Sequence, residues 1–142
     1  MPKSAVPGPA PPAGGDPIAW LAGVEHLDAA SGLRQCGNRG EMYRYLLGRF
    51  VQLYGQGASQ LTERVEAADW LGLSEAVHSL RGASATIGAS QVHRLASELE
   101  QRCTSTDVNE AAGRDALAAS TEELQQALLA LTAQLRARLS VA

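Results

Sequence analysis

Hydrophobic residues recur every three or four positions along most of this chain, with polar residues between them. Over residues 41–69 this spacing places apolar side chains on one side of a helix, because an α-helix has 3.6 residues per turn. Gly55 and Gly57 weaken this helix by about 1 kcal/mol each relative to alanine, and a break near Gly55 is one alternative. We predict a single long helix with the following inward-facing residues: Met42, Leu46, Phe50, Leu53, Leu61 and Val65.

The same spacing predicts a short helix over residues 28–36 and a long one over residues 70–87. Asp28 opens the first and Asp69 stands just before the second, and a carboxylate at an N-cap position can accept hydrogen bonds from the first free N–H groups of a helix. Gly88 is expected to end the long helix. The inward-facing residues predicted for it are Leu73, Val77, Leu80, Ser84 and Ile87.

Two more helices complete the predicted fold. Ser90 is expected to cap the first of them, and Asp107 and Glu110 have the spacing of a capping box at the start of the second. Four amphipathic helices joined by short loops favour an all-α fold, an antiparallel four-helix bundle with a short additional N-terminal helix. The inward-facing residues predicted for the last two helices are Val92, Leu95, Leu99 and Cys103, then Leu117, Thr121, Leu124, Leu128, Leu131 and Leu135.

Residues 1–17 differ in composition from the rest of the chain. They contain all six prolines and few side chains that can join a core, so the cost in conformational entropy predicts a disordered tail or linker. Residues 18–142 contain no proline and are predicted to form one helical domain. The composition agrees with an aliphatic helical core, since 45% of the residues are hydrophobic and only 4% are aromatic.

Charge and composition exclude several classes of protein. The net charge of −3, with mixed signs throughout, leaves no basic stripe for nucleic acid. No apolar run reaches the roughly 20 residues needed to cross a bilayer, so we expect no membrane contact and a cytoplasmic location. Cys36 and Cys103 lie far apart and form no metal-ligand pattern with the scattered histidines, so no metal site is predicted.

One histidine of the helix over residues 70–87 lies opposite its apolar face. At about 100° per residue, His78 points away from the predicted core. The residues three, four, seven and eleven positions later lie on the same side. They are Arg81, Gly82, Ala85 and Ala89. Because a glycine inside a helix costs about 1 kcal/mol, this smooth strip favours a surface on which the active site of another protein closes over the ring.

The pair His78 and Arg81 is suited to phosphoryl transfer. An unprotonated imidazole is a nucleophile near neutral pH. A guanidinium offers a permanent positive charge and a planar fork of donors for phosphate oxygens. The sequence contains no G-x-x-x-x-G-K-[ST] loop and no glycine-rich segment between a strand and a helix that could hold ATP.

The stretch AVHSLRGASATIGASQVHRLASELE, residues 76–100, resembles the signature of histidine-containing phosphotransfer (HPt) domains. That signature is approximately A-H-x-L-K-G-x-[SA]-x-x-[LIV]-G-[AL], followed by a helix that ends in L-E, and the resemblance covers about residues 26–103. It implies a helical bundle without kinase activity of its own. It also implies that His78 is the phosphorylated histidine, that Arg81 stands in for the usual lysine, and that Gly82 leaves room around the ring.

The resemblance implies the partners as well. HPt domains take a phosphoryl group from an aspartate on one response-regulator receiver domain and pass it to an aspartate on another. Magnesium belongs to the receiver, so no cofactor is expected in this chain. The chain is expected to be a monomer, either free-standing or joined to a hybrid sensor histidine kinase. The candidate docking residues are Leu71, Ser74, Glu75, Ala85, Ala89, Ser90 and Gln91.

Two other functions stay open on the sequence. The bundle is alternatively a scaffold or inhibitor that binds a receiver or kinase without being phosphorylated. A purely structural bundle that oligomerises through apolar surface is the third reading, although packing alone gives no reason for Gly82. His93 lies one position off the apolar face of its helix and is predicted to be a solvated residue without a catalytic role.

Overall fold

The computed structural model describes residues 15–141, and its regular structure there is helical. The short helix capped by Asp28 is confirmed, since the Asp28 carboxylate accepts a hydrogen bond from the Ser31 N–H. Residues 1–14 lie outside the described part, so the disordered tail over residues 1–17 stays a prediction. The elements are η1 (Ala19–Leu21, a 3₁₀ turn), α1 (Ala29–Gln35), α2 (Gly40–Tyr54), α3 (Ser59–Glu66), α4 (Trp70–Ile87), α5 (Ser90–Ser105) and α6 (Ala111–Leu139).

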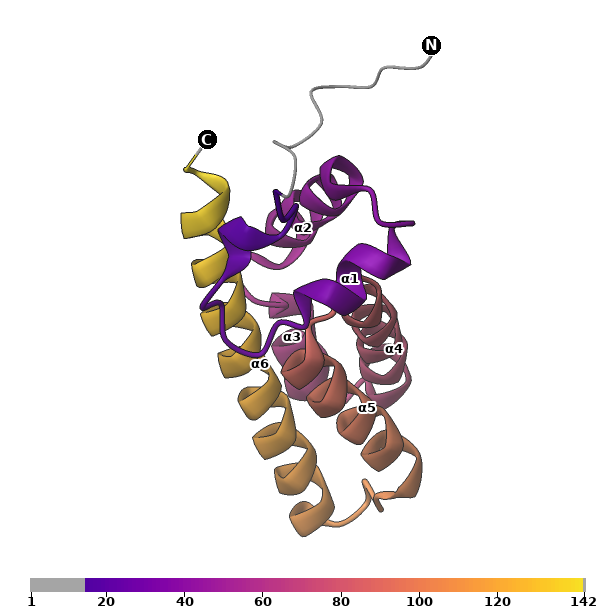
Figure 1. Cartoon of the computed structure of the whole chain (residues 1–142). Helices are drawn as coiled ribbons and strands as arrows, with labels where there is room; N and C mark the ends of the chain where they lie inside the picture. Colours follow the sequence, from indigo (N-terminus) through magenta and orange to yellow (C-terminus); the bar gives the residue numbers. More distant parts are fainter. Residues whose placement is uncertain (1–14, 142) are drawn as a thin grey trace.

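The helices form the predicted bundle (Figure 1). α5 packs between α4 and α6, while α3 contacts both α4 and α6 and so closes the ring. α2 precedes α3 in the chain and packs mainly on α6. α1 lies against α4. The all-α four-helix arrangement with a short additional helix is therefore confirmed. Within residues 15–141, no helix is both long enough and apolar enough to span a membrane.

The prediction of one long helix over residues 41–69 is wrong. The chain breaks between Tyr54 and Ser59, where Gly57 adopts a left-handed φ of +76°. The side chain of Gln125 on α6 stabilises the break, because its Oε1 accepts a hydrogen bond from Ala58 N–H at 2.7 Å and its Nε2 donates to Ala58 O at 2.8 Å. This amide satisfies backbone groups that a continuous helix would have satisfied internally.

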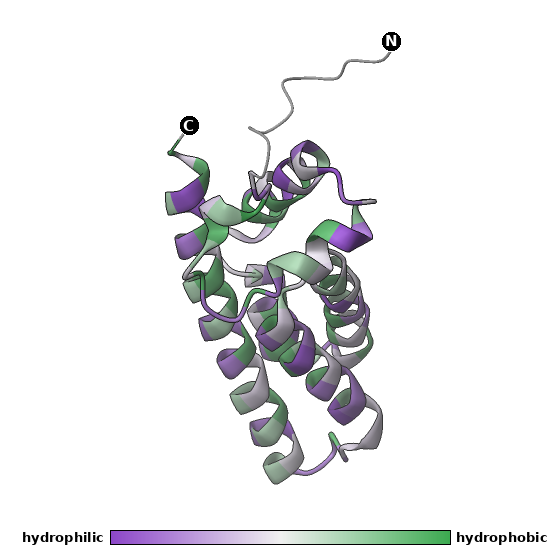
Figure 2. Ribbon diagram, viewed as in Figure 1, coloured by the Kyte–Doolittle hydropathy of each residue, from purple (hydrophilic) through white to green (hydrophobic). Residues whose placement is uncertain are grey.

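The inward-facing residues predicted for α4 and α6 are all buried, as are Val92, Leu95 and Leu99 of α5. Hydrophobic and hydrophilic residues alternate accordingly along α6 (Figure 2). Cys103 is only half-buried. In α2 the predicted face is displaced: Leu53 is 62% exposed. The fully packed residues of α2 are Tyr43, Leu47 and Phe50.

Two predicted helix caps are also wrong. α5 begins at Ser90 with Ala89 as its N-cap, and the Ser90 hydroxyl donates instead to the carbonyl oxygen of His26 at 3.1 Å. At the start of α6, Glu110 occupies the N-cap position without a side-chain hydrogen bond. The Asp107 carboxylate accepts a hydrogen bond from Asn109 N–H, so it stabilises the loop rather than the helix.

The end of α4 is fixed by contacts with α1 and α2. Gly88 ends the helix, as predicted, with a left-handed φ of +79°. Asp28 N–H donates to Gly88 O at 2.7 Å, and the buried Tyr43 hydroxyl donates to Ile87 O at 2.7 Å. Burial raises the pKa of the Tyr43 hydroxyl, so this group stays a proton donor at physiological pH. The helix that carries His78 therefore has a rigidly held C-terminus.

Candidate functional site

His78 lies in the middle of α4, and its side chain is 63% exposed. The neighbouring positions Val77 and Leu80 are fully buried, so the helix is anchored in the core directly behind the ring. The N-terminus of α4 is capped, because the Asp69 carboxylate accepts a hydrogen bond from Gly72 N–H. The imidazole thus projects into solvent from a helix that is fixed at both ends.

Glu100 on α5 contacts the ring. Its Oε2 lies 2.7 Å from Nδ1 of His78, within hydrogen-bond distance. A carboxylate only accepts hydrogen bonds, so this contact assigns a proton to Nδ1. In the neutral ring the lone pair is then on Nε2, the nitrogen that does not face Glu100.

Arg81 shares the same carboxylate. Its Nε lies 2.8 Å from the other oxygen of Glu100, Oε1, as an ion pair without hydrogen-bond geometry. The Arg81 side chain is 39% exposed, and ion pairs this accessible contribute no more than about 1 kcal/mol. The guanidinium can therefore leave Glu100 at small cost when another anion approaches.

The surface beside His78 is smooth. Gly82 is exposed, and a Cβ atom added to it would meet nothing within 4 Å outside the helix. Ala85, one turn further along, is exposed as well. Toward the start of α4, Leu71 is 73% exposed, Glu75 is exposed, and Ser74 is half-buried. The exposed face of α4 is thus formed by Leu71, Ser74, Glu75, His78, Arg81, Gly82 and Ala85.

Three of the predicted docking residues lie elsewhere. Ala89 is only 1% exposed, so placing it on the exposed strip was wrong: α4 ends at Ile87, and the turn carries Ala89 inward. Ser90 is exposed, and with Ala85 and His93 it lines a shallow hollow at the end of the α4–α5 seam. Gln91 lines a different groove, between α5 and α6.

The residue that sequence reasoning missed is Glu100. It belongs to the L-E ending of the signature, a position that the resemblance links to no function. A usable signal exists, because His78 and Glu100 lie eleven residues to either side of Ala89. When two helices fold back on each other at a tight turn, positions equally distant from the turn lie side by side.

The thiol of Cys103 lies one turn beyond Glu100 on α5. Burial, together with the negative charge of Glu100, raises the pKa of this thiol. Cys103 is therefore a protonated, unreactive group at neutral pH rather than a second nucleophile. Over residues 15–141 no cluster of three or more His, Cys, Asp or Glu side chains is arranged to hold a metal ion.

An all-helical bundle that exposes an imidazole held by a carboxylate and flanked by a guanidinium has the features of a phosphotransfer module. The family model of the Hpt domain matches residues 46–138, more than half of the chain, and the chain belongs to this family. Hpt domains act in phosphorelays as phosphotransfer carriers rather than kinases, and they interact with receiver domains. No curated protein and no solved structure matches the chain.

Proposed function

We propose that this protein accepts a phosphoryl group on Nε2 of His78 from an aspartyl phosphate of one receiver domain and passes it to an aspartate of another. The observation that carries the proposal is the 2.7 Å contact between Nδ1 of His78 and Glu100 on an exposed ring. This contact leaves Nε2 as the free nucleophile, on a surface that another protein can reach.

The step transfers one phosphoryl group between two carriers. The Nε2 lone pair of His78 attacks phosphorus, an N–P bond forms, and the P–O bond to the receiver aspartate breaks and releases a carboxylate. The Nδ1 proton stays on the ring, which becomes positively charged as the new bond forms. The carboxylate of Glu100 stabilises this charge at close range, so the step needs no separate base.

Arg81 supplies the compensating positive charge for the phosphoryl oxygens. Its guanidinium exchanges Glu100 for those oxygens during transfer, which is inexpensive because the ion pair is partly solvated. The receiver is proposed to supply Mg²⁺ together with its aspartate, so this chain contributes only protein groups. Phosphoryl transfer depends mainly on positioning and electrostatics, which this division of labour provides.

The receiver is proposed to dock on the exposed face of α4. An apolar hollow of about 180 Å³ lies beside that face, between α2 and α4. Its lining includes Phe50, Ala83, Ile87 and Leu53, and the Leu53 side chain is 62% exposed. An apolar hollow next to a polar reactive centre suits the small, transient interface that a relay requires.

The proposal is tested by incubating the chain with a phosphorylated receiver domain and following the label. We expect acid-labile phosphate on the chain, in the one tryptic peptide that contains His78, and a phosphorus–nitrogen coupling to Nε2 in NMR spectra. The phosphorylated chain is then expected to label a second receiver. A receiver that binds the chain without transferring label would favour the scaffold function instead.

Replacing Glu100 with alanine is expected to slow phosphoryl transfer by about tenfold or more, because the ring loses the group that fixes its tautomer. The ¹⁵N NMR shifts of the His78 ring should then show a mixture of tautomers. Glu100→Gln should restore part of the rate, since its amide oxygen also accepts a hydrogen bond from Nδ1. Rates and ring shifts are measured on the same samples.

The control for this variant is Glu98→Ala on the same helix. Glu98 pairs with Arg94 at 3.1 Å and does not contact His78. It should leave both the rate and the tautomer unchanged. If Glu100→Ala keeps the wild-type rate and a single tautomer, Glu100 does not position the ring.

Substitution of Gly82 should separate stability from function. Gly82→Ala is expected to raise the free energy of unfolding by about 0.5 to 1 kcal/mol, because the added methyl group meets no neighbour. Gly82→Leu should slow transfer by at least about tenfold, since its side chain covers the approach to the ring. Gly48→Leu on α2, where a Cβ atom also meets nothing within 4 Å, serves as the control and should transfer normally. Equal rates for the two leucine variants would contradict a role for Gly82 in access.

A further inference from the structure

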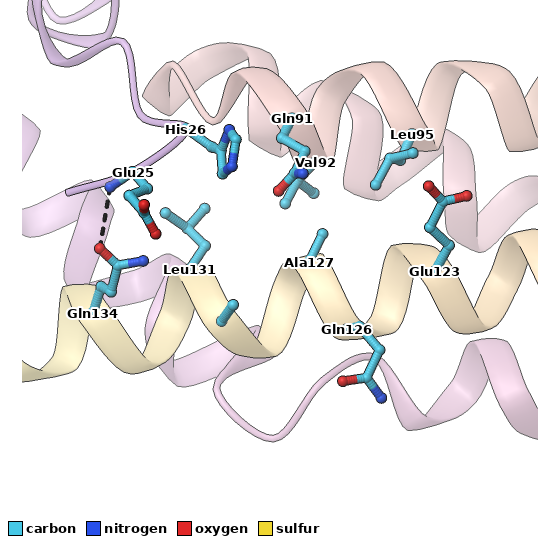
Figure 3. Close-up of a pocket in the computed structure, with 11 residues that line it drawn as sticks. Glu25, His26, Gln91, Val92, Leu95, Glu123, Gln126, Ala127, Leu131 and Gln134 are labelled. Atoms are coloured by element: carbon cyan, nitrogen blue, oxygen red, sulfur yellow. Dashed lines mark hydrogen bonds between the residues drawn. The ribbon is translucent and has the colours of Figure 1, made fainter.

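A groove of about 400 Å³ runs along the exposed side of α2. The groove between α5 and α6 (Figure 3) has no accessible apolar floor, because Val92, Leu95 and Leu131 belong to the core and are each at most 5% exposed. The groove on α2 differs, since Tyr45 is 61% exposed and no atom of residues 15–141 lies within 4 Å of a Cβ atom added to Gly48. The residues of α2 that line it are Glu41, Arg44, Tyr45, Gly48, Arg49 and Gln52.

Hydrogen-bond donors surround the exposed ring in this groove. Nη1 of Arg49 donates to Oε1 of Gln52 at 2.9 Å, which uses the acceptor of Gln52 and leaves its Nε2 group to donate. The guanidinium of Arg49 and the hydroxyl of Tyr45 supply further donors. The groove therefore fits an occupant that is rich in acceptors and carries apolar rings to cover Tyr45.

The proline-rich start of this chain has that chemistry. Proline has no N–H group, so a proline-rich backbone presents mainly carbonyl acceptors. Segments of this composition favour the extended polyproline II helix, which binds aromatic-lined grooves at low cost in conformational entropy. Pro9 and Pro12 are three residues apart, which is one turn of such a helix. The prolines that precede the described residues are Pro2, Pro7, Pro9, Pro11 and Pro12.

Pro17, the last proline of the chain, lies at the start of the groove. A Cβ atom added to Gly40, the first residue of α2, would lie 3.0 Å from Cβ of Pro17. Nε1 of Trp20 donates to the carbonyl oxygen of Pro17 at 3.1 Å. The guanidinium carbon of Arg44 lies 4.4 Å from the centre of the Trp20 ring, and Arg44 lines the groove. The segment before Pro17 thus joins the bundle beside the N-terminal end of the groove.

The segment is long enough to follow the groove. Glu41 and Gln52 are eleven residues apart on α2, which corresponds to about 16 Å. A polyproline II helix rises about 3.1 Å per residue, so about six residues cover this length. Only four residues separate Pro12 from Pro17, so the effective concentration of the segment at the groove is on the order of millimolar. Weak contacts suffice for binding at this concentration.

We propose that the proline-rich segment over residues 7–12 binds along α2 of its own chain as a polyproline II helix. Its proline rings pack on Tyr45, and its carbonyl oxygens accept hydrogen bonds from Arg49 and Gln52. This differs from the disordered tail that the composition predicts. The proposal does not depend on phosphotransfer, because no residue of the His78 site lines the groove.

The test measures ¹⁵N order parameters of the full chain by NMR relaxation. Ala10 and Ala13 should have values above about 0.7, whereas a free tail gives values below about 0.6. Nuclear Overhauser contacts are expected between the ring of Tyr45 and proline side chains. The order parameters should not change with protein concentration. Values that rise with concentration would show that the segment binds a second copy of the chain, which would overturn the proposal.

Two leucine variants provide the matched comparison. Gly48→Leu fills the groove and should lower the order parameters of Ala10 and Ala13 below about 0.6. Gly82→Leu adds the same side chain at another open helical position, outside the groove, and should leave them unchanged. Free-tail values in the unmodified chain, or equal changes in the two variants, would also overturn the proposal. Neither result bears on phosphate transfer to His78, which is measured separately.

Discussion

The variant His78→Gln is expected to carry no acid-labile phosphate after incubation with a phosphorylated receiver domain. Glutamine retains a polar side chain of similar reach, but its amide nitrogen has no lone pair available for attack on phosphorus. The His78 side chain is 63% exposed, so the change in the free energy of unfolding should stay within about 1 kcal/mol. Label is quantified by gel autoradiography, and folding is checked by circular dichroism.

The matched control is His93→Gln. His93 is half-buried on α5 and is not part of the exposed face of α4. This variant should accept label at the wild-type rate. Retained label on His78→Gln, or lost label on a folded His93→Gln, would show that His78 is not the acceptor.

The second large effect is expected for stability. Gly88→Ala should lower the free energy of unfolding by about 3 kcal/mol or more, because two penalties add. The residue has a φ of +79°, which alanine adopts only with strain. Its Cβ atom would also collide with the backbone carbonyl of Asp28. Relief of that collision requires α1 to move away from the end of α4. Urea unfolding of both proteins measures the difference.

Gly37→Ala isolates the backbone penalty from the collision. Gly37 also has a left-handed φ, of +64°, but a Cβ atom there meets nothing within 4 Å. The expected loss is about 1 to 2 kcal/mol, from backbone strain alone. If Gly88→Ala and Gly37→Ala destabilise the protein equally, the contact between α1 and the end of α4 contributes nothing.

The long helices α4 and α6 were predictable because their signals are local. Regular apolar spacing and a terminal glycine or cap belong to a single segment and need no knowledge of the rest of the chain. The break between α2 and α3 is different. It depends on the amide of Gln125, which lies 67 residues from Ala58, and no local pattern indicates that contact.

The displaced face of α2 has a comparable cause. Spacing alone favoured the set that contains Met42 and Leu53, but the helix is rotated so that Tyr43 is buried and its hydroxyl reaches Ile87 O at 2.7 Å. Burying Tyr43 with a hydrogen bond for its hydroxyl stabilises the fold more than burying Leu53 would, so Leu53 stays exposed. This partner lies on another helix and is not visible in the α2 sequence.

For the candidate site, the orientation of His78 followed from helix geometry and the apolar face of its own helix. The position of Glu100 followed only from how α5 folds back along α4. Ala89 was placed on the exposed face of α4 by helical spacing, but that spacing holds only within the helix. Gly88 ends α4, and the turn that it forms carries Ala89 into the core.

The single carboxylate of Glu100 serves both His78 and Arg81, and this affects how the site treats free anions. With a neutral ring, the charges of Glu100 and Arg81 cancel, so the resting site has little long-range attraction for inorganic phosphate or nucleotides in solution. Under the proposed function, a phosphoryl donor would therefore have to be held against the surface by other contacts before Arg81 turns toward it. In the proposed relay, this charge cancellation would favour a donor that is carried by a docking protein over free anions in solution.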